Sequence, residues 1–467
     1  MSAPGATAAL TREALVALAE QALAAARAAG ADHADSVVES SRAFSVTVNQ
    51  QRIDTLKHSV THGLGLRVIV GGATGVVSTN DFDPDHLADL ARRAVALARF
   101  STPDEANAIP TRDQAEDGVP ELPAGADPVG MFDPALLEWP AEARIAFAFE
   151  LERIAHAIDP RVTRCDHVGV SAHDGQWVLA NTNGVLRHER GASASTAVVA
   201  LADDGGGKQQ SGGFGVSRRR LVDLPTPDAV AGEAVRRALA RIGARSVPSA
   251  KVPVIMHPDI AGAWLAELSG AFSGEAVMKR SSWLSERLGQ VIASPLVTIV
   301  DDGRLRHGVG SSLYDGEGIR TRRNLLLDRG TCAMFAYDLY TARRVGARST
   351  GNASRSYAGV PGIGYHNLFI PAGTDSPAEI LKRVDRGFYM DDQGSFGFNG
   401  VTGDYSFQAQ GSWIEHGERA FPVEGVTIAS NSLDMLRNVA AVGNDLVFDG
   451  SVAAPTLLIA EMTLSGR

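Results

Sequence analysis

The chain has 467 residues, of which 44% are hydrophobic and 21% are charged, and its formal net charge is −10. This length exceeds one ordinary hydrophobic core, so we expect a globular protein of two or three domains. An acidic chain opposes binding to phosphates, which argues against a nucleic-acid partner.

Three features of the sequence indicate where the protein resides. The first 30 residues have alanines at helical spacing but no basic stretch ahead of an apolar run, which is unlike a signal peptide. No apolar run is long enough to cross a bilayer, so we expect no membrane partner. Only two cysteines, Cys165 and Cys332, occur in this long chain, which is typical of a reducing compartment. These features predict a cytoplasmic protein.

The first 100 residues have the pattern of a small α+β domain. Thr11 is the expected N-cap of a first helix that ends near Gly30. Apolar and polar residues alternate over 44–48 and 64–70, which predicts two strands, and a third strand begins at Gly75. A second helix begins at Asp83-Pro84 and runs to about residue 100. A helix, an antiparallel sheet and a second helix form a compact unit over residues 1–100.

Residues 101–139 are rich in Pro, Asp, Ala and Gly and show no periodicity, so we expect a linker or an irregular arm. The following region, residues 140–245, is predicted to be rich in strands. It begins with a helix over 141–158 and ends with a helix over 227–242. Between them we expect strands at 163–172, 177–182, 186–201 and 213–221.

Residues 246–467 form the predicted C-terminal domain, whose central stretch is 258–302. Ile260, Trp264 and Leu268 have the 3–4 spacing of a buried helical face. This helix is expected to break at Ser273-Gly274, and a strand over 296–300 is expected to end before Asp301.

Later elements of this region alternate between strands and short helices. A strand is predicted at 325–328, and a helix over 335–346. Ser376, Pro377 and Glu379 form a capping-box pattern for a helix that ends at Gly387. Strands at 405–414, 426–429 and 457–461 and a short helix at 433–439 complete an α+β fold class.

No residue cluster has the spacing of a metal site. His188-Glu189 lies in a predicted strand, with no second histidine at the spacing that zinc peptidases need. His58 and His62 would stand about 13 Å apart on a strand. We therefore expect no metal ligand in this chain.

Nucleophilic catalysis has no better candidate. The chain has no Gly-x-Ser-x-Gly motif, and Cys165 and His167 flank Asp166 on a predicted strand without a Cys-His signature. A buried structural Cys165 is the simpler interpretation. Residues 205–208, GGGK, lack the spacing of a phosphate loop and predict a hairpin tip. We therefore expect no catalytic residue.

The central stretch and several later motifs resemble the TldD/PmbA family, also called modulators of DNA gyrase. Residues 316–323, GEGIRTRR, resemble the family segment EG.RT.R, and residues 349–353, STGNA, resemble its STG.A turn. Residues 400–406, GVTGDYS, resemble the G.TGDYS strand start of PmbA. Residues 431–438 and 442–445 resemble its closing segments. The resemblance covers most of residues 250–467 and, less specifically, the first 100 residues.

The resemblance implies a TldD/PmbA-like fold and a role in a peptidase. In the TldD branch the central helix carries a His-Glu-x-x-x-His zinc motif, and a Cys ligand lies near the C-terminus. Here residues 265–270 contain no histidine, and residues 449–455 contain no cysteine. The chain therefore resembles the PmbA (TldE) branch, the subunit without the metal.

This branch implies a partner that supplies zinc. The resemblance implies a complex with a TldD-type zinc peptidase subunit, or a self-dimer, that processes or degrades small unfolded peptides such as microcin-type precursors. Two other hypotheses stay open: a self-contained homodimeric hydrolase, and a homodimeric peptide-binding protein without a catalytic partner.

A peptide-binding groove is predicted where the PmbA-like strand begins. Glycines allow close approach of a ligand backbone, and Tyr405 offers an apolar ring. The resemblance implies that two arginines lie nearby, which could bind a peptide carboxylate or an acidic side chain. The predicted peptide-binding residues are Arg320, Arg322, Thr402, Gly403, Asp404, Tyr405 and Ser406. The alternative is that Asp404 is buried and only accepts hydrogen bonds from loop amides.

Overall fold

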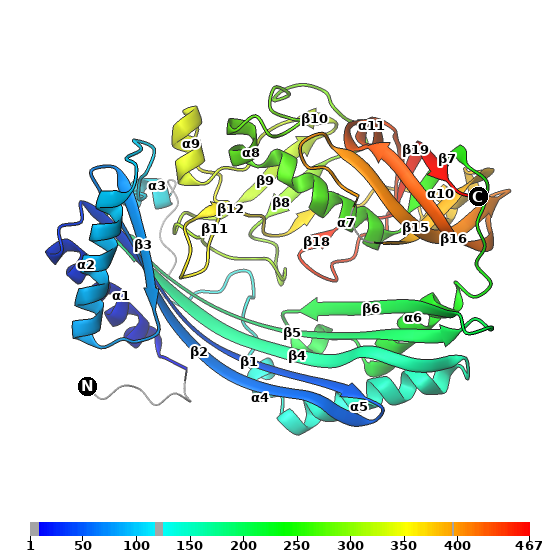
Figure 1. Cartoon of the computed structure of the whole chain (residues 1–467), viewed down its shortest axis with the longest axis horizontal. Helices are drawn as coiled ribbons and strands as arrows, with labels where there is room; N and C mark the ends of the chain where they lie inside the picture. Colours follow the sequence, from blue (N-terminus) through cyan, green and yellow to red (C-terminus); the bar gives the residue numbers. More distant parts are fainter. Residues whose placement is uncertain (1–8, 117–124, 395–396) are drawn as a thin grey trace.

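The chain folds into a long curved sheet with a second, strand-rich body on its concave side (Figure 1). The computed structural model describes residues 9–116, 125–394 and 397–467. Residues 33–218 provide the strands of the curved sheet, and residues 250–465 provide those of the C-terminal body. This is the α+β fold with an N-terminal antiparallel sheet that the sequence predicts.

The curved sheet has the strand order β3-β2-β1-β4-β5-β6, and its pairings are antiparallel. Its strands are β1 (His33–Asn49), β2 (Arg52–Val70), β3 (Ala73–Thr79), β4 (Val162–Asn181), β5 (Leu186–Asp203) and β6 (Gln209–Arg218). Because β1 pairs with β4, with Val38 opposite Val178, the segments before and after the 101–139 arm share one sheet.

The strands of this sheet are longer than the sequence predicts. The two strands expected at 163–172 and 177–182 are one strand, β4, because Gly175 stays in register between Ser41 and Gly191. Polar residues between the two expected strands do not break the strand, because they have partners within the structure. Asp174 pairs with Arg42 and Arg190, and Gln176 donates a hydrogen bond to the Leu10 backbone.

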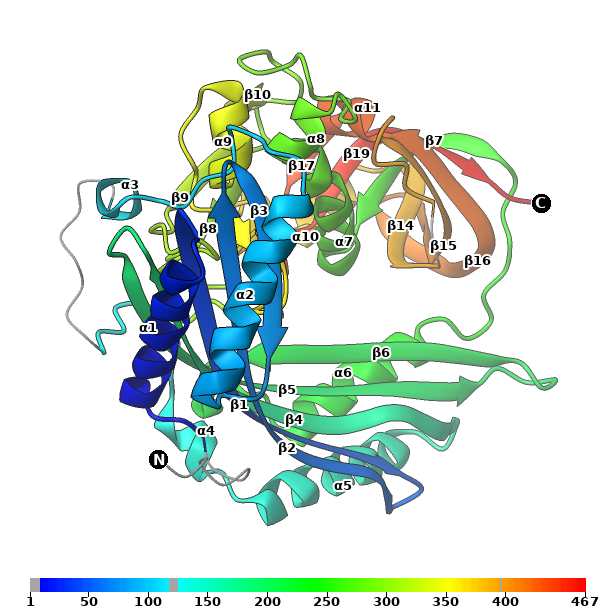
Figure 2. The ribbon, with the colours of Figure 1, turned by 60° about the vertical axis from the view of Figure 1, so that its left-hand side comes forward.

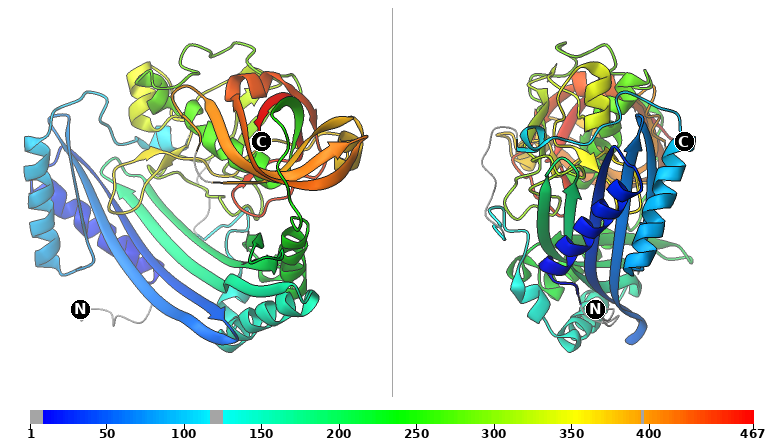
Figure 3. Two further views of the ribbon diagram at one scale, coloured as in Figure 1. Left: turned by 45° about the vertical axis from the view of Figure 1, so that its right-hand side comes forward. Right: turned by 90° about the vertical axis from the view of Figure 1, so that its left-hand side faces the viewer.

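Helices cover the outer face of the sheet at both ends (Figures 2 and 3). They are α1 (Arg12–Ala28), α2 (Pro84–Phe100), α5 (Ala141–Ile158) and α6 (Pro227–Leu239). The side chains of Thr11, Asp83 and Thr226 accept hydrogen bonds from the first turns of α1, α2 and α6. Two apolar clusters, around Leu66 under α1 and α2 and around Val170 under α5 and α6, fasten the helices to the sheet.

The 101–139 arm runs between the sheet and the C-terminal body. Its described part contains two short helices, α3 (Arg112–Glu116) and α4 (Pro134–Glu138). Met131 of the arm packs with Leu313 and Tyr314 of the C-terminal body, and Pro110 accepts a hydrogen bond from Asn181 of β4. The arm therefore joins the two layers.

The C-terminal body contains two main sheets. The five-stranded sheet has the order β10-β9-β8-β13-β18, and the six-stranded sheet has the order β16-β15-β14-β7-β19-β17. Because β16 also pairs with β19, five strands of the second sheet close into a small barrel. The strands are β7 (Ala250–Met256), β8 (Ile299–Asp302), β9 (Arg323–Asp328), β10 (Thr331–Cys332), β13 (Leu368–Phe369), β14 (Arg386–Gln393), β15 (Asp404–Glu415), β16 (Glu418–Asn431), β17 (Val439–Val442), β18 (Val452–Ala453) and β19 (Leu457–Ser465).

Short elements connect these strands. They are α7 (Pro258–Ser269), α8 (Gly274–Met278), α9 (Leu339–Val345), α10 (Pro377–Lys382), α11 (Ser432–Arg437), a 3₁₀ turn at Gly270–Phe272, and a two-stranded ribbon of β11 (Ala353–Ser354) and β12 (Gly362–Ile363). Another 3₁₀ turn, Leu221–Asp223, lies between β6 and α6. The capping box of α10 forms as predicted between Ser376 and Glu379.

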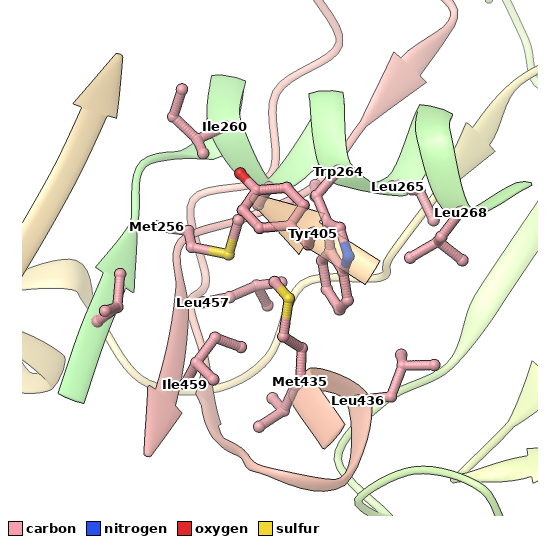
Figure 4. Packing of buried hydrophobic residues seen from close by; sticks show 14 of the residues in the cluster. Met256, Ile260, Trp264, Leu265, Leu268, Tyr405, Met435, Leu436, Leu457 and Ile459 are labelled. Carbon is pink, nitrogen blue, oxygen red and sulfur yellow. The ribbon is translucent and has the colours of Figure 1, made fainter. Parts of the chain in front are cut away.

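Helix α7 lies at the centre of the C-terminal core. Ile260, Trp264 and Leu268 of α7 belong to one buried cluster with Met256 of β7 and Leu457 of β19, and Trp264 lies among these side chains below the helix (Figure 4). The Trp264 indole Nε1 donates a hydrogen bond of 3.2 Å to Ser432 Oγ. The 3–4 spacing of the sequence therefore identified the buried face of this helix correctly.

The ends of three elements differ from the sequence predictions. In each case a long-range pairing or a helix cap sets where the element begins or ends. The strand after α7 runs through Asp301, which pairs with Leu368 of β13. Helix α9 begins only after Asp338, whose carboxylate caps Thr341. Helix α10 ends at Lys382 and not at Gly387, because Arg386–Gln393 pairs as β14 with β15 and β7.

Candidate functional site

The outer face of α7 lines a cavity of about 440 Å³ between the two layers, which we call the α7 cavity. Gly262, Ala263 and Ala266 form the wall on the helix, and the loop at 445–454 forms the opposite wall. These small side chains are the counterpart of the large apolar side chains that α7 turns toward the core. The cavity is therefore wide where the helix has no bulky group.

The charged groups around the α7 cavity already have protein partners. Arg237 forms an ion pair of 2.5 Å with Asp259. Asp445 accepts hydrogen bonds from the Thr456 backbone and hydroxyl, and Asp449 forms a 2.7 Å ion pair with Arg218. These contacts fix the walls of the cavity.

His257 caps α7 from the first turn, where its Nδ1 accepts a hydrogen bond of 3.2 Å from the Asp259 backbone. Burial, with the Arg237 charge nearby, lowers the pKa of His257, and the Asp259 charge only partly opposes this. A neutral imidazole that is already an acceptor serves as a helix cap.

The α7 cavity does not have the donor set of a zinc site. Zinc needs three or four ligand atoms within about 2 Å. Gly262, Ala263 and Ala266 of the cavity wall carry only hydrogen or methyl side chains, and Asp259 in the first turn of α7 is paired with Arg237. Over residues 9–116, 125–394 and 397–467, no group of three or more His, Cys, Asp and Glu residues could hold a metal ion. His188, His58 and His62, the histidines considered from sequence, lie in β5 and β2.

A second hollow of about 320 Å³ lies on the concave face of the curved sheet and meets the α7 cavity at Asp449. Its floor consists mainly of small side chains from β1, β4, β5 and β6, such as Ser45, Ser171, Ser195 and Ser217. Ser195 and Ser217 share a hydrogen bond of 2.7 Å between their hydroxyls. The two hollows adjoin at Asp449, and we refer to them together as the interlayer cleft.

The structure places the predicted peptide-binding residues in two separate settings. Arg320 is buried, with its guanidinium 3.7 Å from Glu116 and its backbone N–H donating to Ala115. Arg322 follows it and is only partly exposed. Arg320 therefore lies against the arm.

The strand start at 402–406 alternates between core and solvent. Tyr405 is 1% exposed, packs in the core beside Trp264 and donates a hydrogen bond of 2.9 Å to Gln393 (Figure 4). Thr402, Asp404 and Ser406 are exposed. Tyr405 therefore cannot offer its ring to a ligand as predicted, because the period of β15 turns it inward.

Asp404 is not buried, in contrast to the alternative stated above. Hydrogen bonds from Thr402 Oγ1 (2.6 Å) and Asn431 Nδ2 (3.0 Å) lower its pKa. Gly403 has a φ of +79° and lies against the Trp283 ring, so this turn requires glycine. Peptide binding at this turn stays a prediction that rests on its exposed residues.

Sequence reasoning missed a third hollow, of about 290 Å³, which we call the Arg355 pocket. It lies between the concave face of β1 and β4 and the C-terminal loops that carry Arg355 and His366. Residues 39, 177 and 189 lie side by side across β1, β4 and β5, and only this register brings them together with residues 312–316 and 353–366. The only local signal was a pair of charged residues two apart in β5, Arg187 and Glu189.

Glu189 is the most perturbed acid beside this pocket that belongs to the sheet. Burial raises its pKa to about 7, although hydrogen bonds from the Ser312 hydroxyl and from the backbone of Tyr314 and Leu313 oppose the shift. The carboxylate accepts these bonds at 2.9–3.1 Å. Glu189 therefore fastens the 312–314 loop to the curved sheet.

Both cysteines are buried and free, as the sequence predicts for structural cysteines. Burial raises the pKa of Cys165 to about 12 and that of Cys332 to about 11, so both thiols are protonated and poorly nucleophilic at neutral pH.

None of the helices in the described ranges combines the length and apolarity needed to cross a bilayer.

Family models and solved structures match this architecture. Models of the PmbA/TldA metallopeptidase match domain 1 at residues 34–98, the central domain at 134–242 and the C-terminal domain at 249–466. The metalloprotease PmbA of Escherichia coli O157:H7 is 29% identical over 436 residues, which cover 93% of each chain. The PmbA homologue of Haemophilus influenzae is 26% identical over 427 residues, 91% of this chain and 90% of that protein.

The fold is also that of TldE from Thermococcus kodakarensis, with a TM-score of 0.84 and 22% identity, covering 96% of this chain and 99% of that chain. At this identity the likeness concerns the fold alone. The three matched segments cover most of the chain, and the relatives match it nearly from end to end. The chain belongs to the PmbA/TldD metallopeptidase family.

Proposed function

We propose that this chain is the metal-free, TldE-type subunit of a TldD/TldE-type metallopeptidase complex that processes or degrades small unfolded peptides. The observation that carries the proposal is the outer face of α7. The helix that bears the zinc motif in the TldD branch here turns Gly262, Ala263 and Ala266 toward the cavity. None of these side chains can bind a metal, so the zinc chemistry belongs to a partner subunit.

The partner is a TldD-type zinc subunit, and a self-dimer forms when that subunit is absent. A full-length relative named as a metalloprotease supports a peptidase complex. The net charge of −10 supports a peptide substrate over a nucleic acid, although other family members are named after DNA gyrase. The complex acts in the cytoplasm, in keeping with the two free thiols.

Extended peptide binds in the interlayer cleft. Small side chains on the concave floor let a peptide backbone approach the sheet closely. The edge of β6 is not free for strand addition, because Arg241 and Arg237 donate to the carbonyls of Ser211 and Gly213, and the Ser217 N–H donates to Asp449. The turn at Thr402, Asp404 and Ser406 is a second candidate contact. Variants that test this turn must change exposed residues, because Tyr405→Ala and Arg320→Ala alter buried ones.

The test is co-expression of this chain with a TldD-type subunit from the same host. We expect the two chains to co-purify, with about one zinc per partner subunit and chelator-sensitive cleavage of an unfolded peptide. This chain alone should hold no stoichiometric zinc, cleave nothing, and scatter light with a mass above that of the 49.1 kDa monomer.

Two outcomes would overturn the proposal. The first is about one tightly bound zinc on the isolated chain together with chelator-sensitive cleavage, which would make it a self-contained hydrolase. The second is failure of the chain to associate with the zinc subunit under conditions where that subunit folds and binds its metal.

A further inference from the structure

The Arg355 pocket is a built cavity between the two layers, separate from the α7 cavity. Its floor on the sheet consists of Val37, Trp177 and Leu179, and its roof consists of C-terminal loops that include Arg355 and His366. A volume of about 290 Å³ is at the lower end of small-molecule sites, which begin at about 300 Å³. It suits a ligand of the size of one amino-acid residue.

Arg355 supplies hydrogen-bond donors that nothing in the described chain uses. Its side chain is 4% exposed, and its Nη1 forms an ion pair of 2.9 Å with Asp35. Its buried Nε and Nη2 atoms have no hydrogen-bond partner among the described residues. Unpaired buried N–H groups of a guanidinium are costly, and a carboxylate with two oxygens is their natural complement.

His366 provides a second donor in the wall of the pocket. Its backbone N–H donates to Asp301 at 2.7 Å, and its Nδ1 lies 3.4 Å from the other oxygen of that carboxylate. The remaining ring nitrogen, Nε2, carries a proton and can donate to a ligand when the ring is the imidazolium. Burial alone would lower the pKa of His366, but the hydrogen bond and the charge of Asp301 outweigh it and raise the pKa, which favours imidazolium.

The carboxylates that line the pocket differ in how many further hydrogen bonds they can accept. Asp315 already accepts hydrogen bonds from the backbone of Glu317, Ile319 and Ala353. Glu39, on β1 beside Trp177, is partly buried, and burial raises its pKa although a hydrogen bond from the Tyr357 backbone and the charge of Arg355 oppose the shift. A carboxylate has two oxygens, so beyond the Tyr357 bond Glu39 can still accept an N–H from a ligand.

We propose that the Arg355 pocket binds the carboxylate of an amino-acid-sized group with an apolar side chain, namely the C-terminal residue of a short peptide. Arg355 and His366 receive the carboxylate, and Trp177 with Val37 and Leu179 receives the side chain. Glu39 accepts the amide N–H. A free amino acid offers the same carboxylate and side chain and is the other source of this chemistry. The inference rests on the peptide-binding part of the proposed function and names a specific end of the substrate.

The test is calorimetric titration of the isolated full chain with the tripeptide Ala-Ala-Leu, its C-terminal amide, and free leucine. We expect the tripeptide acid to bind and the amide to bind about tenfold or more weakly, because the amide loses charge-assisted hydrogen bonds. Free leucine that binds as well as the tripeptide assigns the pocket to free amino acids. Equal binding of acid and amide, or no binding of either acid, overturns the inference.

Variants of pocket residues test whether the tripeptide binds in the Arg355 pocket. Arg355→Gln should weaken the tripeptide about tenfold, and the exposed Arg348→Gln is the matched control that should leave binding unchanged. Because Arg355 also pairs with Asp35, two further variants guard against simple unfolding. His366→Asn removes a donor, and Val37→Phe fills the floor. Wild-type affinity in both of these folded variants places the ligand elsewhere and overturns the inference.

Failure of this proposal is distinguishable from failure of the proposed function. The pocket is tested on this chain alone, with no zinc and no partner. The subunit role is tested by association with a TldD-type chain and by the metal of that chain. A chain that co-purifies with its partner but ignores peptide carboxylates refutes only the pocket.

Discussion

The α7 cavity and the Arg355 pocket lie in the same interlayer space but differ in what surrounds them. The α7 cavity has a wall of small apolar side chains, and its charged groups have partners elsewhere in the protein or in the lining. The Arg355 pocket is bordered by buried ionisable groups, among which Glu189 has a pKa near 7 and Arg355 has unused donors. Perturbed groups mark sites of binding or chemistry more often than paired surface charges do.

This difference shows that buried polar groups, which lower stability, are concentrated around the Arg355 pocket and not around the α7 cavity. Buried carboxylates that are raised to neutral pKa values weaken the fold as they ionise. The curved sheet and the C-terminal loops tolerate several of them around the Arg355 pocket, whereas the α7 cavity owes its shape to ordinary apolar packing behind the helix. Three predictions sharpen this contrast.

The largest expected effect is on the core side of α7. Trp264 is fully buried and its indole Nε1 donates to Ser432. Trp264→Ala should lower the free energy of unfolding by about 3–5 kcal/mol, because it removes a large buried ring and leaves a cavity. Urea denaturation followed by circular dichroism measures this loss.

The control for that variant is Leu97→Ala on α2, where the leucine is 49% exposed. This change should alter the free energy of unfolding by no more than about 0.5 kcal/mol. A loss below about 1 kcal/mol for Trp264→Ala would show that α7 is not the anchor of the C-terminal core.

The second prediction concerns Glu189 and the pH dependence of stability. Its pKa is raised from 4.5 to about 7, so between these pH values the folded chain holds a proton that the unfolded chain has released. Its contribution to stability is therefore present below pH 4.5 and is lost as the pH rises through about 7. This loss is at most about 3 kcal/mol.

Glu189→Gln removes that titration while keeping an acceptor for the Leu313 and Tyr314 backbone and an amide for Ser312. The variant should gain stability relative to wild type by up to about 3 kcal/mol between pH 5 and pH 8. Urea midpoints at several pH values measure the difference, and the exposed Glu20→Gln provides a flat baseline. Parallel pH profiles for Glu189→Gln and wild type would contradict the assignment.

Local signals in the sequence were sufficient for much of the fold. Thr11 and Ser376 cap their helices as predicted, because a cap depends on residues within one turn. The helix over 141–158 and the buried face of α7 follow from apolar spacing alone. Boundaries failed where a distant segment decides, as when pairing with β13 extends β8 through Asp301.

The Arg355 pocket could not be predicted in the same way. Glu39, Glu189 and His366 lie far apart in the sequence, and only the pairing of β1, β4 and β5 and the docking of the C-terminal loops bring them together. The strand start at 402–406 could be recognised from its motif. The inward orientation of Tyr405 could be inferred from the alternation of exposed and buried residues along β15 only once the start of that strand was known.

The smallest expected effect is on the cavity side of α7. Ala266 is exposed in the wall of the α7 cavity, so Ala266→His adds an imidazole there without disturbing the core. The free energy of unfolding should change by no more than about 0.5 kcal/mol, as for an exposed Ala24→His control on α1.

The same variant tests whether the α7 cavity is one residue short of a metal site. A single histidine leaves zinc without the three protein ligands that it needs, because the other candidate ligands of the lining already have partners. Asp445 is held by Thr456, Asp449 by Arg218 and Asp259 by Arg237, and His257 Nδ1 accepts a hydrogen bond in the helix cap. Added zinc should therefore not raise the melting temperature of Ala266→His above that of Ala24→His. Stoichiometric, stabilising zinc binding to Ala266→His but not to Ala24→His would mean that the paired carboxylates can become zinc ligands. The two hollows would then not differ in whether their charged groups are available to a ligand.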